Sequence, residues 1–211
     1  MIAETRIGSS QAVPPGAIAE AAGGQFGQPL TGDISAKYQE AVRKGNCFIA
    51  VDTTVRLLDA PDATPVGMTL ANPTTSTKNL VLLYAAGCHN GTALTAAGVV
   101  MLTSGASKGT EVTTGTAVTI RNCLIGSAAN SIAVASVAAT VPTTGVALYS
   151  LGVALTGSVA TTIWAPVLGG FLDGAIIVAP GGYINFNSTV TLTGAGGGII
   201  NTTLAWEEIP V

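Results

Sequence analysis

The sequence predicts an all-β protein, an antiparallel β-sandwich (jelly roll) preceded by an extended N-terminal arm and one short helix. Three observations lead to this prediction. From residue 47 onward short β-rich runs alternate with turn signals, no helix-period segment follows Gly45, and Thr, Ser, Asn, Ala and Gly replace charged residues. Many short strands at such spacing are typical of a sandwich rather than of alternating strands and helices.

The first 32 residues predict the arm. They contain Pro14-Pro15-Gly16, Gly23-Gly24 and Gly27-Gln28-Pro29, with few large apolar residues between these breaks. Such a segment cannot bury enough apolar surface to offset the entropy of ordering its backbone. We therefore expect residues 1–32 to order only against a partner, and we assign residues 1–45 to an N-terminal unit.

One short helix is predicted over residues 34–44. Asp33 caps its start, Tyr38 and Val42 share one face, and Gly45 follows its last turn. A helix of about three turns is marginal by itself, so we expect it to pack against the β-domain or a neighbouring subunit.

The β-domain is predicted over residues 46–211, with at least eight strands. In Ser131–Thr140 the apolar content alone would also suit a helix, but the alternation in Ile132-Ala-Val134-Ala favours a strand. Breaks between runs include Asn72-Pro73, Asn90-Gly91 and Gly169-Gly170. The predicted runs are Cys47–Thr53, Val66–Ala71, Asn79–Ala85, Gly98–Thr103, Ala117–Ile125, Ile132–Ala138, Val146–Ala154, Thr161–Val167, Gly174–Ala179, Tyr183–Phe186 and Ile199–Trp206.

Charge is scarce and unevenly placed. Charged residues make up 9% of the chain, against roughly 25% in ordinary soluble domains. Only Lys108, Glu111 and Arg121 fall in residues 90–170. A neutral surface of that length poorly suits a free monomer, whose solubility depends on net charge, so we predict a permanent oligomer or a surface-bound state. For the isolated protein we predict a homotrimer.

Several partner classes are excluded by the same composition. A net charge of −3 leaves no basic stripe to neutralise phosphates, so no nucleic acid is expected as a partner. No apolar run reaches the roughly 18 residues of a membrane span, so no membrane is expected either. Residues 1–6 lack the features of a secretory signal, and we expect synthesis without a signal peptide.

The three cysteines predict neither disulfides nor a metal site. Cys47, Cys88 and Cys123 have no CxxC spacing, so we expect reduced thiols that serve as buried apolar fillers. Together with His89 they would be numerous enough to hold zinc, but they lack its short paired spacings. No cofactor is predicted.

Catalytic constellations are equally sparse. His89 is the only histidine, and its neighbour Cys88 would face the opposite way on a strand, which excludes a thiolate–imidazole pair. Glu207 and Glu208 would also face opposite ways, one toward solvent and one toward a subunit interface. Asp173 is the main candidate for a second acid in glycoside hydrolysis, the weakest of the hypotheses. We therefore predict no catalytic residue and no enzymatic activity.

The turn at Pro180-Gly181-Gly182 is predicted to join two strands as scaffolding, because proline removes a donor and glycine permits positive φ. Tyr183 and Trp164 would alternatively line a sugar-binding pocket. Aromatic residues make up only 5% of the chain, which leaves little material for stacking on carbohydrate.

Four stretches carry a family resemblance, namely Lys37–Asn46, Asn72–Leu83, Ala175–Tyr183 and Leu204–Glu208. Together they resemble structural proteins of tailed bacteriophages, specifically head decoration or cement proteins with a jelly-roll body. The resemblance implies a subunit on the outside of an icosahedral head, commonly a trimer, that ties neighbouring major capsid protein subunits together. It implies synthesis in the host cytoplasm, a location on the virion surface and no catalytic residues. A tail fibre, spike or receptor-binding β-module is the alternative.

Overall fold

The computed structural model describes residues 37–89, 94–105, 110–154, 167–194 and 200–211. The chain divides into two units, residues 1–40 and 41–211. The predicted arm, residues 1–32, lies outside the described residues. The helix α1 covers Gln39–Arg43, inside the predicted range, and none of its residues is buried. Lys37 and Tyr38 form a turn before it, and residues 34–36 are outside the description.

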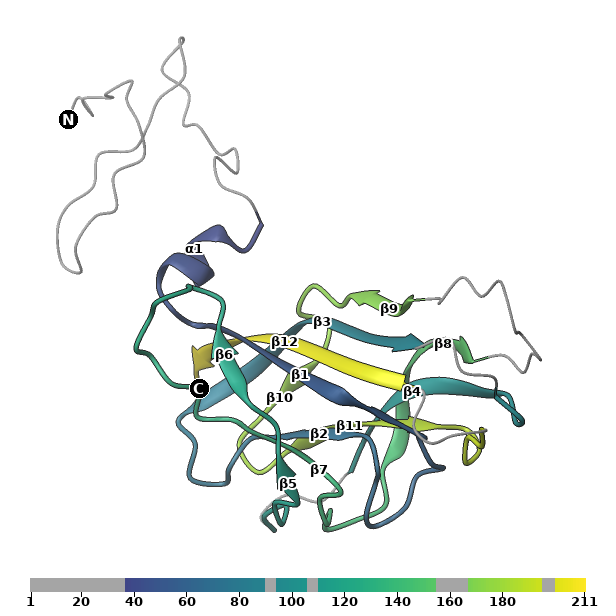
Figure 1. Cartoon of the computed structure of the whole chain (residues 1–211). Helices are drawn as coiled ribbons and strands as arrows, with labels where there is room; N and C mark the ends of the chain where they lie inside the picture. Colours follow the sequence, from purple (N-terminus) through teal and green to yellow (C-terminus); the bar gives the residue numbers. More distant parts are fainter. Residues whose placement is uncertain (1–36, 90–93, 106–109, 155–166, 195–199) are drawn as a thin grey trace, which may run out of the picture. The chain divides into compact units, whose positions relative to one another are not determined.

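The second unit contains two antiparallel sheets that face each other (Figure 1). This arrangement confirms the predicted all-β sandwich with one short helix, whereas the jelly-roll path stays a prediction. Sheet I has the order β10 (Ile177–Val178), β3 (Lys78–His89), β12 (Ile200–Pro210), β1 (Cys47–Arg56) and β6 (Ile120–Asn122), with β9 (Val167–Phe171) also paired to β3. Sheet II has the order β5 (Thr116–Ala117), β7 (Val134–Val137), β2 (Met68–Ala71), β11 (Tyr183–Ser188), β4 (Gly98–Ser104) and β8 (Val146–Ala154).

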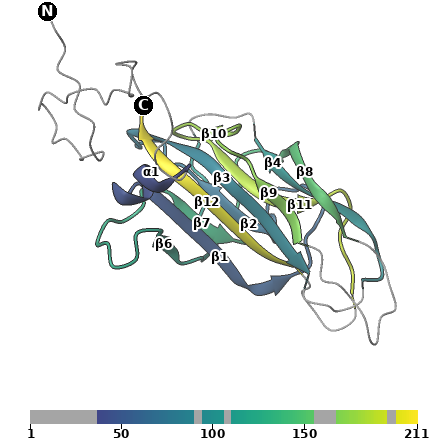
Figure 2. The same cartoon turned by 90° about the horizontal axis from the view of Figure 1, so that it is seen from above.

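The core lies between the sheets and follows from the two-residue period of their strands. In β12, which runs between β3 and β1 (Figure 2), every second side chain from Ile200 to Glu208 is buried. Trp206 is fully buried and stacks on Phe48, its partner in register on β1, with ring centroids 6.3 Å apart. The alternation therefore directs the largest side chain of the strand into the centre of the sandwich.

The strands β7 (Val134–Val137) and β9 (Val167–Phe171) test predictions about individual segments. Ser131–Thr140 contains the strand β7, so the helical alternative for this run is wrong. Gly169-Gly170 was predicted to separate two strands, but both residues lie inside β9, so this prediction is wrong. Gly169 has φ of 117°, and a Cβ there would lie 2.2 Å from the carbonyl oxygen of Ala85, so glycine is needed for close strand approach rather than for a turn. The predicted strand Thr161–Val167 falls outside the described residues except for Val167.

The turn at Pro180-Gly181-Gly182 does join two strands, but they belong to different sheets. β10 pairs with β3 in sheet I, and β11 pairs with β2 and β4 in sheet II. The segment is therefore a crossover from one layer to the other. Asn72 anchors it, because its side-chain Nδ2 donates to the carbonyl oxygen of Val178 at 2.9 Å and its main-chain N–H donates to that of Gly182.

A polar network is buried against sheet II. The Thr103 hydroxyl lies 2.5 Å from Oδ1 of Asn185 and 2.6 Å from Oδ1 of Asn187. Nδ2 of Asn187 donates to Oδ1 of Asp59 at 3.2 Å, and the Asp59 carboxylate also accepts the main-chain N–H of Val66. The network fixes the connection between β1 and β2 onto the sheet. It also places a carboxylate where burial raises the pKa of Asp59, helped by repulsion from Asp62.

We expect Asp59→Asn to raise the melting temperature at pH 7. The pKa of Asp59 is higher in the folded than in the unfolded chain, so its favourable contribution is complete below the unfolded pKa of about 3.9 and is lost as pH rises through the folded pKa. The gain from the amide should therefore shrink as pH falls through the folded pKa, and it should be smallest below the unfolded pKa of about 3.9. Thermal melts at pH 7 and pH 3.5 measure this difference. Asp62→Asn, which removes only the repulsion, should give a smaller gain, and equal stability of Asp59→Asn and wild type at pH 7 would contradict the account.

Candidate functional site

The strand β8 forms one edge of sheet II. It pairs with β4, and no strand among the described residues pairs with its other side. Its first five residues are all exposed, including Val146, whose relative exposure is 69%, Leu148 and Tyr149. The strand carries no charged residue. Natural edge strands are usually protected by charge, proline or distortion. β8 has neither charge nor proline, and its exposed apolar side chains indicate a surface that a partner covers.

Two bulges distort β8. Its register with β4 shifts between the pairs at Val100 and Met101 and again between those at Leu102 and Thr103. The shifts leave Leu151 and Leu148 without a residue directly opposite on β4. A bulge bends its strand and re-aims the extra side chain. Leu151 is buried, and Leu148 borders a pocket between the sheets.

Sheet I contributes a second apolar group on the same side of the sandwich, where β8 and β9 approach each other (Figures 1 and 2). Phe171 at the end of β9 is 70% exposed, and its ring meets the edge of the Tyr84 ring at a centroid distance of 5.4 Å. Ile177 on β10 is 56% exposed. Neither strand holds a charged residue. We call Val146, Leu148, Tyr149, Phe171 and Ile177 the apolar edge.

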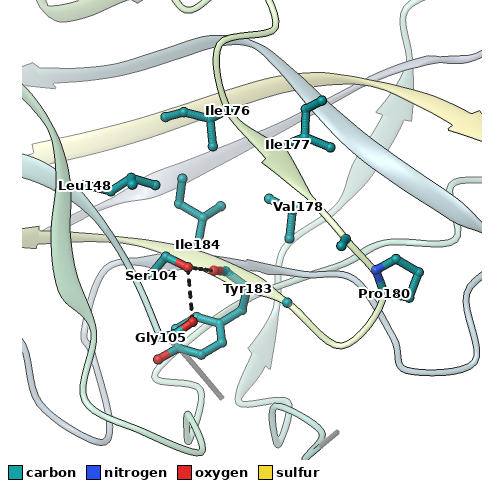
Figure 3. Close-up of a pocket in the computed structure, with 11 residues that line it drawn as sticks. Ser104, Gly105, Leu148, Ile176, Ile177, Val178, Pro180, Tyr183 and Ile184 are labelled. Atoms are coloured by element: carbon teal, nitrogen blue, oxygen red, sulfur yellow. Dashed lines mark hydrogen bonds between the residues drawn. The ribbon is translucent and has the colours of Figure 1, made fainter. Parts of the chain in front are cut away.

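A pocket of about 190 Å³ opens between the two halves of the apolar edge. Figure 3 shows Leu148, Ile176, Val178 and Ile184 around one hollow, with Pro180 at its end. These residues come from both sheets. The pocket is therefore a hydrophobic gap at the open side of the sandwich.

The polar groups beside this pocket are already engaged. The Ser104 hydroxyl donates to the carbonyl oxygen of Tyr183 at 2.8 Å, and the Tyr183 hydroxyl donates to that of Thr143. Tyr183 is 1% exposed, and burial raises its pKa. Its ring is thus not presented for stacking on a sugar, and Trp164, the other residue of that hypothesis, lies outside the described residues. The arrangement suits an apolar side chain rather than a substrate.

A second pocket, of about 400 Å³, lies beside β1, β5 and β6. Its buried carboxylate, Asp52, is paired: Oδ2 lies 2.9 Å from Nε of Arg56, and Oδ1 accepts the main-chain N–H of Thr54. The remaining lining is mostly threonine and valine, with the exposed Arg121. These contacts engage the carboxylate of the pocket, which is therefore held in an ion pair within the domain.

Cys88 and His89 face opposite sides of β3, as the sequence predicted, but with the environments exchanged. Cys88 is exposed and His89 is buried, so the expectation of a buried filler at Cys88 is wrong. Burial lowers the pKa of His89 and keeps the imidazole neutral. The strand geometry separates the thiol from the imidazole and provides no nucleophile–base pair.

Glu207 and Glu208 also face opposite ways, as predicted. The buried position of Glu208 is explained by contacts within its own domain and does not require a subunit interface. Glu208 is buried within its own domain, where Oε2 lies 2.9 Å from Nζ of Lys78 and Oε1 accepts from the Ser131 hydroxyl and the Ile132 N–H. Glu208 therefore has a structural role. Asp173, the proposed second acid, lies exposed in the turn after β9 with φ of 53°.

The remaining cysteines adjoin each other on neighbouring strands. The main-chain N–H of Cys123 donates to the carbonyl oxygen of Cys47 at 2.9 Å. Cys47 is buried as predicted, whereas Cys123 is half-buried. In the described part of the chain no three His, Cys, Asp or Glu side chains cluster to hold a metal, and no helix there is long and apolar enough to cross a membrane.

The thiols are expected to differ sharply in reactivity. At pH 8 Ellman's reagent should modify Cys88 rapidly and Cys47 only after unfolding, because burial, Glu207 and Cys123 raise the pKa of Cys47 to about 12. Burial also raises the pKa of Cys123, which should react slowly. Stopped-flow absorbance would resolve the phases. A fast phase that survives in Cys88→Ser would contradict this assignment.

The apolar edge was not predicted residue by residue. The neutral stretch 90–170 indicated the need for a partner, and the run Val146–Ala154 was identified as a strand, which β8 confirms with the same bounds. The sequence signal for this edge was the pair of consecutive large apolar residues Leu148 and Tyr149. A strand with one solvated face would instead alternate apolar and polar residues.

No protein-family model, curated protein or solved structure matches this chain.

Proposed function

We propose that the chain is a non-enzymatic structural subunit of a virus particle, which decorates and stabilises the outside of a tailed-phage head. The observation that carries the proposal is the apolar edge, a group of exposed apolar side chains on strands without charged residues, with an apolar pocket between them. Such a side suits permanent association with other protein. The family resemblance supplies the setting, and the partners it implies are the major capsid protein and two further copies of this chain.

The chemistry of the described residues supports a structural role. The buried carboxylates Asp52 and Glu208 are each held in an ion pair within the domain. Cys88 and His89 are separated by the strand that carries them. The two buried carboxylates are thus engaged in holding the fold, while the apolar edge is exposed.

In this proposal the two units divide the work. The sandwich supplies the contacts between copies of the chain, and the N-terminal segment attaches them to the shell. Residues 1–32, with their proline and glycine breaks, offer backbone groups and scattered side chains for wrapping over a neighbouring surface. Attachment should then depend on the segment and assembly on the sandwich.

The test uses purified heads that lack this protein, from the phage that encodes it. Full-length chain and a variant without residues 1–32 are added, and the bound fraction is measured after sedimentation. We expect saturable binding of the full-length chain, with sharply weaker binding of the truncated variant at unchanged circular dichroism. Binding to isolated tails in place of heads would overturn the proposal in favour of a tail fibre or spike. Equal binding of the two forms would remove the segment from the mechanism.

A further inference from the structure

We propose that the apolar edge docks a second copy of this chain head-to-tail, with Phe171 of one copy inserted into the pocket beside Leu148 of the next. Three such contacts close a ring. The proposal rests on the structural role proposed above and deepens it by assigning the surface of self-association.

The strands that carry the apolar edge are electrically neutral. The strands β8, β9 and β10 contain no charged residue. These strands of two copies can therefore meet without like-charge repulsion between them and without removing one of their own charges from water. A partner of opposite charge, such as a basic or acidic protein surface, would find nothing complementary on these strands, whereas another copy is matched in chemistry.

Phe171 projects from the surface, and the pocket beside Leu148 is large enough to receive its ring. Phe171 is the most exposed aromatic ring among the described residues, and its contact with Tyr84 restrains it. The pocket of about 190 Å³ is lined by Leu148, Ile176 and Ile184. A leucine-, isoleucine- and phenylalanine-lined cavity of about 150 Å³ is large enough to bind benzene, so the pocket can hold a phenyl ring. Aromatic side chains in well-packed pockets are the contacts that dominate interface energies.

The bulges of β8 bear on the symmetry of the contact between two copies. A two-fold dimer would pair β8 with β8 of the partner, but the bulges at Leu148 and Leu151 interrupt the regular backbone edge that such pairing needs. The projection and the pocket are instead two different patches, since Phe171 lies on β9 of sheet I and is not among the residues that line the pocket between the sheets beside Leu148. Contacts between two different patches are heterologous, and they generate a closed ring when the rotation closes. A ring of three agrees with the trimer that the sequence predicts.

Light scattering on three charge variants provides the first test. The wild type should have a mass of about 62 kDa, three times the 20.8 kDa of the chain, whereas Phe171→Asp and Leu148→Asp should each shift to about 20.8 kDa. Ile125→Asp is the matched control, since Ile125 is 89% exposed outside the apolar edge, and it should remain trimeric. Because Phe171 is largely exposed, its replacement should not disturb folding, which circular dichroism checks. Trimers that persist in both edge variants would overturn the proposal.

Disulfide trapping tests the head-to-tail arrangement. In a Cys88→Ser background, Phe171→Cys and Leu148→Cys chains carrying different tags are coexpressed and oxidised. We expect cross-linked dimers that contain one chain of each kind, and only monomers from either variant alone. Cross-linking of Leu148→Cys to itself would overturn the head-to-tail arrangement. A monomeric wild type would overturn the inference too, while sedimentation with heads decides the proposed function independently.

Discussion

Replacement of Trp206 with alanine is expected to lower the free energy of unfolding by about 3–5 kcal/mol, the usual range for removing a buried large aromatic side chain. Trp206 is fully buried between the sheets and stacks on Phe48. Its removal loses the transfer free energy of the side chain and leaves a cavity, because strands held by their hydrogen-bond ladders cannot close around it. Guanidinium unfolding at fixed protein concentration measures the change.

Trp206→Phe is the control for this prediction. Among the described residues Nε1 of Trp206 has no hydrogen-bond acceptor, so a phenyl ring forfeits no protein hydrogen bond and keeps part of the stacking on Phe48. We expect it to lose less than half as much stability as the alanine variant. A loss below about 1 kcal/mol in Trp206→Ala would show that this part of the core can collapse, and would contradict the packing described.

Replacement of Glu208 with alanine is expected to lower the free energy of unfolding by about 3 kcal/mol. Removing one partner of a buried ion pair destabilises by about 3–5 kcal/mol, and the lower end applies because the Lys78 side chain is 35% exposed and regains water. The Ser131 hydroxyl and the Ile132 N–H also lose their acceptor. Urea unfolding at pH 7 measures this loss.

The adjacent Glu207→Ala is a matched control, because its side chain points to the other face of β12 and is half-buried. We expect its effect to stay within about 0.5 kcal/mol, as for most surface substitutions. Glu208→Gln should fall between the two variants, since the amide oxygen still accepts while the charge is lost. Equal effects of Glu207→Ala and Glu208→Ala would refute the structural role of Glu208.

The class of fold was predictable from the short β-rich runs between turn signals, and strands with one buried face also show the two-residue period. β12 shows this most clearly: alternate burial from Ile200 to Glu208 follows directly from the period of a strand. The same period placed Cys88 and His89 on opposite faces. It could not tell which face points inward, and so the expectation of a buried Cys88 failed.

Long-range contacts account for what the sequence did not predict. The partners of Glu208 are 130 residues away at Lys78 and 77 residues away at Ser131, and no local pattern connects them. The glycine pair at Gly169 suggests a turn when only the sequence is considered. In the structure the carbonyl oxygen of Ala85 on a neighbouring strand leaves no room for a Cβ at this position. The apolar edge depends on the strand order, because only the topology makes β8 the last strand of its sheet.

The central claim, that this chain is a shell subunit assembled through its apolar edge, is tested most directly by electron cryomicroscopy of the particle that carries it. The account predicts β-sandwich density on the outer surface of the head, in groups of three with Phe171 and Leu148 of adjacent copies in contact. Density for this chain confined to the tail, or its absence from purified particles, would contradict the claim.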